Sequence, residues 1–244
     1  MLRSLKNMFK STDPIVTFDI EISNVFDLED GQDLLDFAPF DISVAATEVQ
    51  GGEQQLWYTK DSSGSPGPDL DKTRAKALLY CLHQLQLSGH RLVAWNGLSF
   101  DLRWIGHAAD DMERARAVAL DLYDPMFQFF KVTGFPVSLA KVAEGLGIRM
   151  KKLMDGADAP VRWQAGDYES VFQYVLGDTR LTLLVAKKID ELGEIRWITQ
   201  RGKLSSKRIG KMRQVKDCLH DPMPDQSWMD MPIPESNFSG WLNQ

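Results

Sequence analysis

The chain has 244 residues, of which 43% are apolar, and its two cysteines are Cys81 and Cys218. This length suits one globular domain with appendages, or at most two small domains, and no apolar run is long enough to span a membrane. Met1–Lys10 lacks the hydrophobic core of a signal peptide. We therefore expect a cytoplasmic protein with reduced thiols and without a cysteine-based metal site.

Charge is distributed unevenly along the chain, although the net charge of −6 by itself argues against a nucleic-acid partner. Residues 196–216 hold eight basic side chains and no acid, and residues 217–244 hold five acids and no Lys or Arg. Residues 1–195 therefore carry a charge of −9. An acidic body beside a basic segment fits a protein that binds both metal ions and phosphate.

The first predicted element is a β-strand over Ile15–Ser23, which is rich in β-branched and aromatic residues but contains Asp19 and Glu21. Residues two apart in a strand point to the same face, so the two carboxylates project side by side. Like charges resist burial unless a cation lies between them. The pair is either the solvated face of an edge strand or a pair of metal ligands, and taken alone it favours the edge strand.

The next elements complete a meander of three antiparallel strands. An acidic loop over Asn24–Pro39 leads to a strand over Asp41–Val49, and a two-glycine hairpin turn leads to the third strand over Gln54–Thr59. Asp61–Asp69, which reads D-S-S-G-S-P-G-P-D, is predicted to be a flexible loop. A helix with an apolar stripe follows over Asp71–Leu87.

The middle of the chain alternates strands and helices. Arg91–Trp95 is predicted to be a short buried strand parallel to the first. Asn96–Asp101, which reads N-G-L-S-F-D, follows it, and Ser99 is expected to cap the next helix. Another strand over Val118–Leu122 leads to Asp124, whose Asp-Pro context indicates a helix N-cap first and a supporting role near a metal second.

Two helices are predicted late in the chain, over Ser138–Leu146 and Asp167–Leu192. In the second, Tyr174 and Asp178 are four residues apart and therefore share a face. Asp178 is either a surface acid beside a core tyrosine or a buried carboxylate that meets a cation. Asp101 also has two interpretations, because a helix dipole favours an acid in the first turn whether or not that acid binds a metal.

The order of elements is three strands, a helix, a strand, a helix, a strand and then helices. It predicts an α/β fold with a central mixed five-stranded sheet, in which three antiparallel strands precede parallel ones and helices flank the sheet. We expect residues 1–195 to form the domain, and residues 196–244 to form a basic segment and a Pro- and Trp-rich extension packed on it.

Three motifs occur in order along these elements: Asp-x-Glu on the first strand, Asn-x-x-x-Phe-Asp after the fourth, and Tyr-x-x-x-Asp on the last long helix. Together they resemble the DEDD superfamily of 3′→5′ exonucleases, which has an RNase H-like fold, in its tyrosine-containing DEDDy branch. Residues 138–178 are similar to exonucleases related to the exonuclease domain of family B DNA polymerases, including stand-alone bacterial or phage enzymes. The resemblance covers roughly residues 13–192. Because only about fifty residues follow this region, we expect a stand-alone exonuclease.

The resemblance implies hydrolysis of phosphodiester bonds at the 3′ end of single-stranded nucleic acid, with DNA favoured over RNA, by a two-metal-ion mechanism. The displacement builds negative charge on the attacking and leaving oxygens, and two Mg²⁺ or Mn²⁺ ions about 4 Å apart stabilise both. Hard divalent ions bind oxygen ligands, which explains a site made of Asp and Glu.

The resemblance also assigns roles to the residues of the three motifs. Asp19, Glu21 and Asp178 would hold the ion that activates water. Asp19 would bridge to the second ion, which Asp101 would support. Tyr174 would orient the attacking water, because a tyrosine with a pKa near 10 is a poor general base at neutral pH.

Nucleic-acid contacts are predicted at two places. Asn96 either touches the terminal nucleotide or forms a turn, with the turn slightly favoured, and Phe100 is assigned to the core ahead of a base-stacking role. The basic segment is either a solvated face or a phosphate-binding surface, and its lack of acids favours the second. Its candidate contacts are Arg201, Lys203, Lys207 and Arg208.

The tail over Asp221–Gln244 also has two interpretations. It either packs on the domain through Trp228, Phe238 and Trp241, or it docks on a partner protein. Packing within the chain is favoured.

Two other functions fit the same motifs. A catalytically weak exonuclease-like module would bind nucleic acid or a protein, but such a module gains nothing from four clustered acids. An RNase H-like endonuclease would need the same metal ions. The tyrosine four residues before the last acid favours the exonuclease by family resemblance.

Overall fold

The structure is a computed structural model that describes residues 13–27, 32, 34–150 and 153–243. Met1–Lys10 and part of the predicted loop over Asn24–Pro39 lie outside the described residues. A four-stranded sheet in the order β3-β2-β1-β4 forms the centre. Its strands are β1 (Ile15–Ile22), β2 (Ile42–Val49), β3 (Gln54–Trp57) and β4 (Arg91–Val93).

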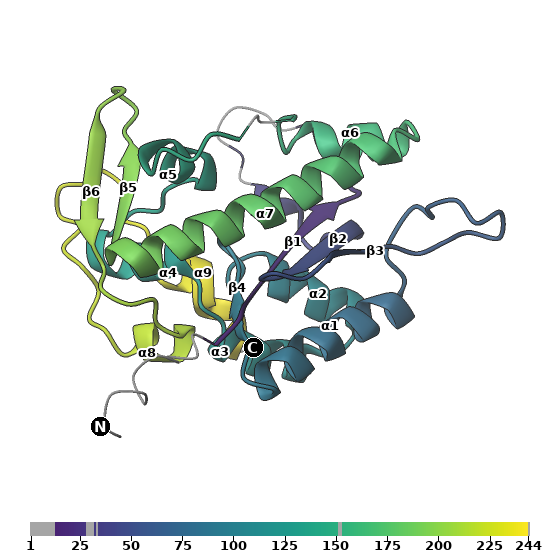
Figure 1. Cartoon of the computed structure of the whole chain (residues 1–244), viewed down its shortest axis with the longest axis horizontal. Coiled ribbons are helices and arrows are strands. Elements are labelled where there is room, and N and C mark those ends of the chain that lie inside the picture. Colours follow the sequence, from purple (N-terminus) through teal and green to yellow (C-terminus); the bar gives the residue numbers. More distant parts are fainter. Residues whose placement is uncertain (1–12, 28–31, 33, 151–152, 244) are drawn as a thin grey trace, which may run out of the picture.

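Helices cover both faces of this sheet (Figure 1). They are α1 (Lys72–Leu87), α2 (Asp101–Ala109), α3 (Met112–Leu120), α4 (Pro125–Thr133), α5 (Leu139–Gly145), α6 (Asp158–Gln164), α7 (Tyr168–Leu192), α8 (Val215–Leu219) and α9 (Ser236–Ser239). The described residues also form two 3₁₀ turns, η1 (Leu34–Phe37) and η2 (Gly240–Asn243). The predicted antiparallel meander of β1, β2 and β3 is confirmed, as is the parallel pairing of β4 with β1.

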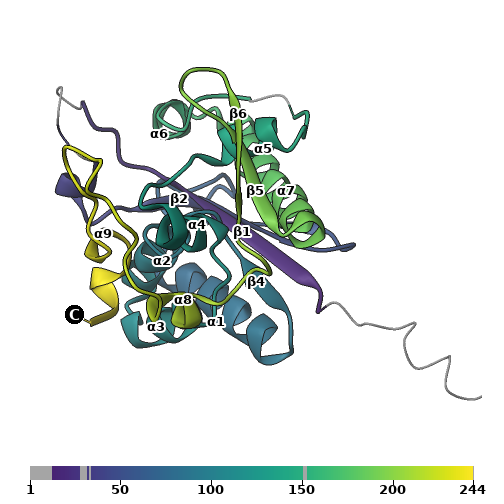
Figure 2. The ribbon, with the colours of Figure 1, turned by 90° about the vertical axis from the view of Figure 1, so that its left-hand side faces the viewer.

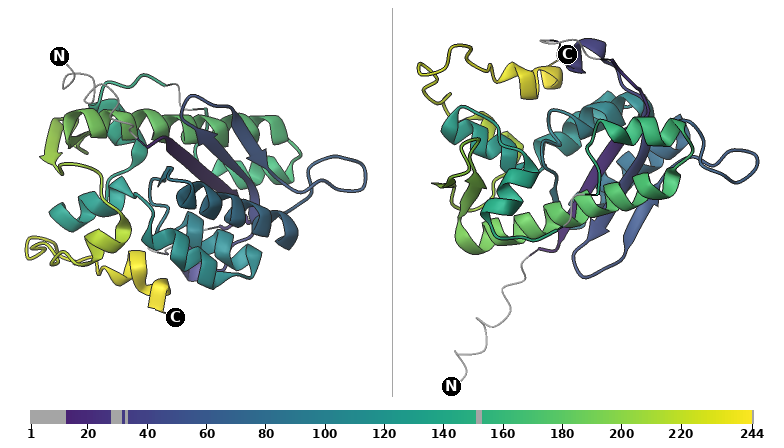
Figure 3. Two further views of the ribbon diagram at one scale, coloured as in Figure 1. Left: turned by 60° about the horizontal axis from the view of Figure 1, so that its bottom comes forward. Right: turned by 90° about the horizontal axis from the view of Figure 1, so that it is seen from above.

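The alternation of β1 divides its side chains between the two helical layers. Val16, Phe18 and Ile20 pack into the core formed with α1, α2 and α3. Thr17 points to the opposite face, where its hydroxyl reaches α7. Seen from above, α7 crosses β1 (Figure 3). Asp19 shares the face of Thr17, so β1 places its acids under the longest helix of the described chain.

The fifth strand predicted over Val118–Leu122 is wrong, because most of this segment belongs to α3. Ala115, Val118, Ala119 and Leu122 are fully buried, and their spacing is that of one helical face. The chain reaches the edge of β4 one residue later, where Tyr123 forms a single parallel bridge with Val93. The apolar run was too short for its alternation to distinguish a strand from a buried helix.

The basic segment begins with a hairpin that no sequence pattern predicted. It consists of β5 (Glu194–Ile198) and β6 (Leu204–Arg208), which pair antiparallel and stand beside α5 and α7 (Figure 2). Gly145 at the end of α5 permits this packing, since a Cβ there would lie 2.5 Å from the backbone nitrogen of Trp197. Only glycine allows the two backbones to approach so closely.

The C-terminal extension passes beside α4 and ends against the helical layer that contains α2 (Figure 3, left). Phe238 and Trp241 are buried in the main core, and the ring of Phe238 lies 4.4 Å from that of Phe130. The nearly buried amino group of Lys131 forms an ion pair with Glu235. Trp228, in contrast, is 62% exposed.

Cys81 and Cys218 are both free thiols. None of the described helices combines the length and apolar character that a membrane crossing requires.

Candidate active site

Three acidic side chains from β1 and α7 converge at the centre of the molecule. Asp19, Glu21 and Asp178 each offer a carboxylate oxygen, and these oxygens all lie within 4.8 Å of one another. The two elements are fixed together beside this cluster, because the hydroxyl of Thr17 donates a 3.0 Å hydrogen bond to the carbonyl oxygen of Thr179. Residues 162 positions apart in the sequence thus meet beside this cluster.

Asp101 approaches the same region from the first turn of α2. β4 ends at Val93, which pairs with Thr17, so β1 extends beyond its parallel neighbour. There the backbone N–H of Ile20, between the two acids of β1, donates a 3.1 Å hydrogen bond to Oδ1 of Asp101. Asp101 thereby satisfies a buried backbone donor at the edge of the sheet.

The electrostatics of the cluster favour a bound cation. Burial, together with the negative charges of Asp101 and Asp178, raises the pKa values of Asp19 and Glu21 well above the ordinary range. Burial raises the pKa of Asp101 to about 7. Within the described ranges, no Lys or Arg forms an ion pair with Asp19 or Glu21. The carboxylates repel one another, and a hard divalent ion such as Mg²⁺ or Mn²⁺, bound by their clustered oxygens, would offset this repulsion.

Tyr174 lies one helical turn before Asp178 and is 8% exposed. Its hydroxyl interacts with the carboxylate of Asp178, which lies on the same face of α7. Burial and the negative charges of Asp178, Glu21 and Asp19 raise the pKa of Tyr174. The phenol is therefore held neutral as a hydrogen-bond donor beside the acids, which excludes a phenolate base at neutral pH.

A cavity of about 520 Å³ opens beside these groups, between α5 and α7. Tyr174, Gly177 and Asp178 line one side of it, and apolar side chains such as Leu139 and Leu153 line much of the rest. Two further cavities, of 630 and 810 Å³, share Ser138 with the first in their linings. Ser138 and its neighbours carry no chemical motif, so the sequence did not identify them.

The predicted turn at Asn96 is confirmed, with a φ of 68°. The carboxylate of Asp124 accepts hydrogen bonds from the backbone N–H groups of Asn96 and Leu98, at 3.2 and 3.1 Å. It also accepts hydrogen bonds from the backbone N–H groups of Met126 and Phe127. This confirms Asp124 as the N-cap of α4. Burial raises its pKa to about 6. Asn96 also lines the 630 Å³ cavity, whose described lining does not include the three converging carboxylates.

The remaining predicted contacts separate into two groups. Phe100 is partly buried in an aromatic cluster, with its ring 5.7 Å from that of Phe40. Arg201 and Lys203 line the 810 Å³ cavity at the tip of the β5–β6 hairpin, whereas Lys207 and Arg208 lie exposed along β6. None of these four cations has an ion-pair partner within the described part of the chain.

The loop that leads to Asp101 is held by the C-terminal extension. The indole N–H of Trp241 donates a 2.8 Å hydrogen bond to the carbonyl oxygen of Leu98, and the hydroxyl of Ser99 donates to the carbonyl oxygen of Asn237 at 3.3 Å. Ser99 is therefore not the cap of α2, contrary to the prediction; Phe100 occupies that position without a side-chain bond. The hydroxyl of Ser99 bonds to Asn237 of the extension and does not cap α2.

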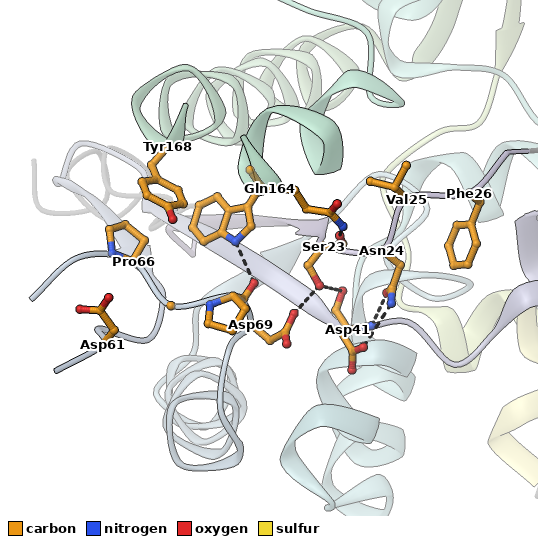
Figure 4. A pocket seen from close by; sticks show the side chains of 13 residues that line it. Ser23, Asn24, Val25, Phe26, Asp41, Asp61, Pro66, Asp69, Gln164 and Tyr168 are labelled. Atoms are coloured by element: carbon orange, nitrogen blue, oxygen red, sulfur yellow. Dashed lines mark hydrogen bonds between the residues drawn. The ribbon is translucent and has the colours of Figure 1, made fainter. Parts of the chain in front are cut away.

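A further hollow of about 740 Å³ lies beyond the end of β1 (Figure 4). Its polar groups bond to one another: the hydroxyl of Ser23 donates to the carboxylate of Asp69, and Asn24 exchanges two hydrogen bonds with Asp41. Asp19, Glu21, Asp101 and Asp178 are not among the described residues that line it. This hollow is separate from the acidic cluster.

A family model of the RNase H superfamily matches residues 40–188. The chain belongs to the RNase H superfamily. The matched residues include Asp101, Tyr174 and Asp178, whereas Asp19 and Glu21 precede them. Membership in this superfamily and the four-stranded mixed sheet agree with each other.

The structure is also similar to that of a family B DNA polymerase from the hyperthermophilic archaeon Pyrobaculum calidifontis. The two share 18% sequence identity with a TM-score of 0.50, over 72% of this chain and 24% of the polymerase. At this identity the likeness establishes the fold alone. The curated protein sequences that were compared contain no match.

The RNase H superfamily and the converging acids together indicate a nuclease that uses divalent metal ions. The predicted RNase H-like fold is confirmed with four strands in place of five.

Proposed function

We propose that the protein is a metal-dependent 3′→5′ exonuclease of the DEDDy type that acts on single-stranded nucleic acid, with DNA as the favoured substrate. The observation that carries this proposal is the meeting of Asp19, Glu21 and Asp178 within 4.8 Å, with Tyr174 beside Asp178 in the lining of the same cavity. The similarity to a protein named as a DNA polymerase supports DNA over RNA.

In this proposal Asp19, Glu21 and Asp178 hold a divalent ion, and Asp19 and Asp101 hold a second. Bound Mg²⁺ or Mn²⁺ would lower the pKa of water and stabilise charge on the phosphate oxygens. Tyr174, one helical turn before Asp178, can position a water beside these carboxylates. The apolar lining of the 520 Å³ cavity excludes bulk water from the terminal nucleotide.

Activity is tested with 5′-labelled single-stranded DNA and RNA oligonucleotides in Mg²⁺ or Mn²⁺, with EDTA and Asp178→Asn as controls. A ladder that shortens from the 3′ end, and that both controls abolish, is expected. A matched variant, Asp190→Asn, alters an acid of the same helix that pairs with Arg91 away from the cluster and should retain the activity.

Two results would contradict the proposal. Internal cuts in the same assay would identify an RNase H-like endonuclease. Binding without any cleavage would identify a nucleic-acid-binding module. A labelled duplex with a recessed 3′ end, included in the same series, measures the preference for single strands.

A further inference from the structure

The 810 Å³ cavity is lined by aromatic and basic side chains that are not part of the acidic cluster. It lies between the tip of the β5–β6 hairpin, the start of α5 and the C-terminal extension. Its lining includes Phe135, Trp197 and Trp228, together with Lys141, Arg201 and Lys203. It shares Ser138 with the cavity that contains Tyr174 and Asp178.

Trp228 is the most exposed aromatic ring of this lining, at 62%. It forms a T-shaped contact with Phe135, with ring centroids 5.9 Å apart and planes at 86°. Its indole N–H donates to the carbonyl oxygen of Asp225 at 3.1 Å. The ring is thus held in place while most of its surface faces solvent, although a tryptophan ordinarily gains from burial.

The segment that carries Trp228 is anchored to the body of the protein. The side-chain amide of Gln226 donates to the carbonyl oxygens of Gly134 and Ile233, at 2.8 and 3.0 Å. A turn then bonds Met229 back to Gln226 at 2.9 Å. Because these bonds fix the backbone on both sides of Trp228, the exposure of the ring is a property of the fold.

The cations opposite Trp228 are available for a ligand. Arg201 and Lys203 are exposed, and neither forms an ion pair with another residue of the described chain. The hairpin tip that presents them is closed by hydrogen bonds between Thr199 and Lys203. A solvent-facing aromatic ring beside unpaired cations is the combination that binds single-stranded nucleic acid, since bases stack on the ring while phosphates meet the cations.

We propose that this cavity, with Trp228 as its stacking platform, binds the single strand several nucleotides upstream of the 3′ end. The proposal rests on the proposed function, because the 3′ end must lie at the acidic cluster for the strand to continue past Ser138 into this cavity. A duplex cannot present its bases to Trp228, so the same contact selects single strands.

Binding of 5′-fluorescein-labelled oligo(dT) of 3 and 12 nucleotides, measured by fluorescence anisotropy in EDTA, tests this inference without hydrolysis. The full-length wild-type protein should bind the 12-mer at least about tenfold more tightly than the 3-mer. Trp228→Ala should lose most of that gain, and Trp228→Phe should retain it. The double variant Arg201→Ala, Lys203→Ala should weaken 12-mer binding and reduce its salt dependence.

Tyr80→Ala is the matched control, since Tyr80 is a 53% exposed aromatic residue of α1 outside the cavity. Equal 12-mer affinity in Trp228→Ala and Tyr80→Ala would overturn the stacking site, and a 3′→5′ ladder from the wild type would leave the proposed function intact. Absence of hydrolysis together with a Trp228-dependent gain would reject the exonuclease and retain the binding site.

Discussion

The hydroxyl of Thr17 donates a 3.0 Å hydrogen bond to the carbonyl oxygen of Thr179, and this bond joins β1 to α7 next to the acids of both elements. Thr17→Val keeps the shape of the side chain and removes the donor. We expect it to lower the free energy of unfolding by about 1 kcal/mol and to weaken Mn²⁺ binding, because Asp178 follows α7 when the helix shifts.

Urea unfolding in EDTA and the rise of Tm with Mn²⁺ measure these two effects. Thr179→Val is the matched control, since its hydroxyl bonds within α7 to Val175 and its carbonyl remains available to Thr17. A Mn²⁺ response that is identical in both variants would show that the bond does not position the cluster.

The acidic cluster should oppose folding when no metal is bound. Glu21 is buried and Asp19 is partly buried near other carboxylates, and their raised pKa values mean that ionisation at neutral pH costs folding free energy. In EDTA, we expect Glu21→Gln to raise the free energy of unfolding by about 1–2 kcal/mol. The same substitution should abolish both the Mn²⁺-dependent rise of Tm and the nuclease activity.

Urea unfolding of wild type and Glu21→Gln, with EDTA or with Mn²⁺, tests whether the variant is more stable than wild type without metal and fails to be stabilised by Mn²⁺. Glu191→Gln changes an exposed acid of α7 that pairs with Lys188, and its unfolding should respond to Mn²⁺ as wild type does. A Glu21→Gln protein that is less stable than wild type in EDTA would contradict a repulsive cluster.

Tyr174→Phe separates packing from positioning. The ring lies in the same buried apolar cluster as Val171 and Val175, so phenylalanine should fold with a Tm near that of wild type. Loss of the hydroxyl beside Asp178 should reduce kcat by about 10- to 100-fold. Steady-state hydrolysis of a labelled oligonucleotide measures kcat, and an unchanged value would exclude a role for the hydroxyl.

The extension should support Asp101 through Trp241. Trp241→Phe preserves the buried ring but leaves the carbonyl oxygen of Leu98 without its 2.8 Å donor, at a cost of about 1–3 kcal/mol. Because Leu98 is three residues before Asp101, nuclease activity should also fall. Trp163→Phe is the matched control, because it removes a hydrogen bond of the same 2.8 Å length from the indole N–H of Trp163 to the carbonyl oxygen of Pro68. It should lower the free energy of unfolding by a similar amount without the same loss of activity.

Thermal unfolding and kcat of both variants decide between a local and a general effect. Equal losses of activity in the two proteins would show that Trp241 stabilises the fold without specifically supporting Asp101.

Asp124 should make stability fall as pH rises. The pKa of Asp124 in the folded state is about 6, against an ordinary value of 3.8. Because the folded state binds this proton more tightly than the unfolded state, protonated Asp124 stabilises the fold at low pH, and this contribution is lost between about pH 4 and pH 6. Two pKa units correspond to about 3 kcal/mol. The free energy of unfolding of wild type, relative to Asp124→Asn, should therefore decrease across this range.

Urea unfolding in EDTA at pH 4, 5, 6 and 7 provides the comparison. Asp110→Asn is a control of opposite sign, because the exposed pair with Lys72 lowers the pKa of Asp110. A difference between wild type and Asp124→Asn that stays constant with pH would show that Asp124 does not titrate in this range.

The sequence by itself determined which elements carry the acids. The alternation of β1 placed Asp19 and Glu21 on one face, and the helical spacing of Tyr174 and Asp178 placed both on one side of α7. Both inferences depend only on the local geometry of a strand or a helix, which neighbouring residues fix. For the same reason, Asp124 could be assigned as an N-cap from the proline that follows it.

Only the tertiary structure decided what these elements meet. The bond from Ser99 to Asn237 replaced a local cap, and the helical burial of Val118 replaced a predicted strand, because contacts far along the chain outweighed short sequence patterns. The approach of β1 to α7, the hairpin that presents Arg201, and the exposure of Trp228 beside it likewise arise from packing between distant segments. Such packing leaves no periodic signal in the sequence.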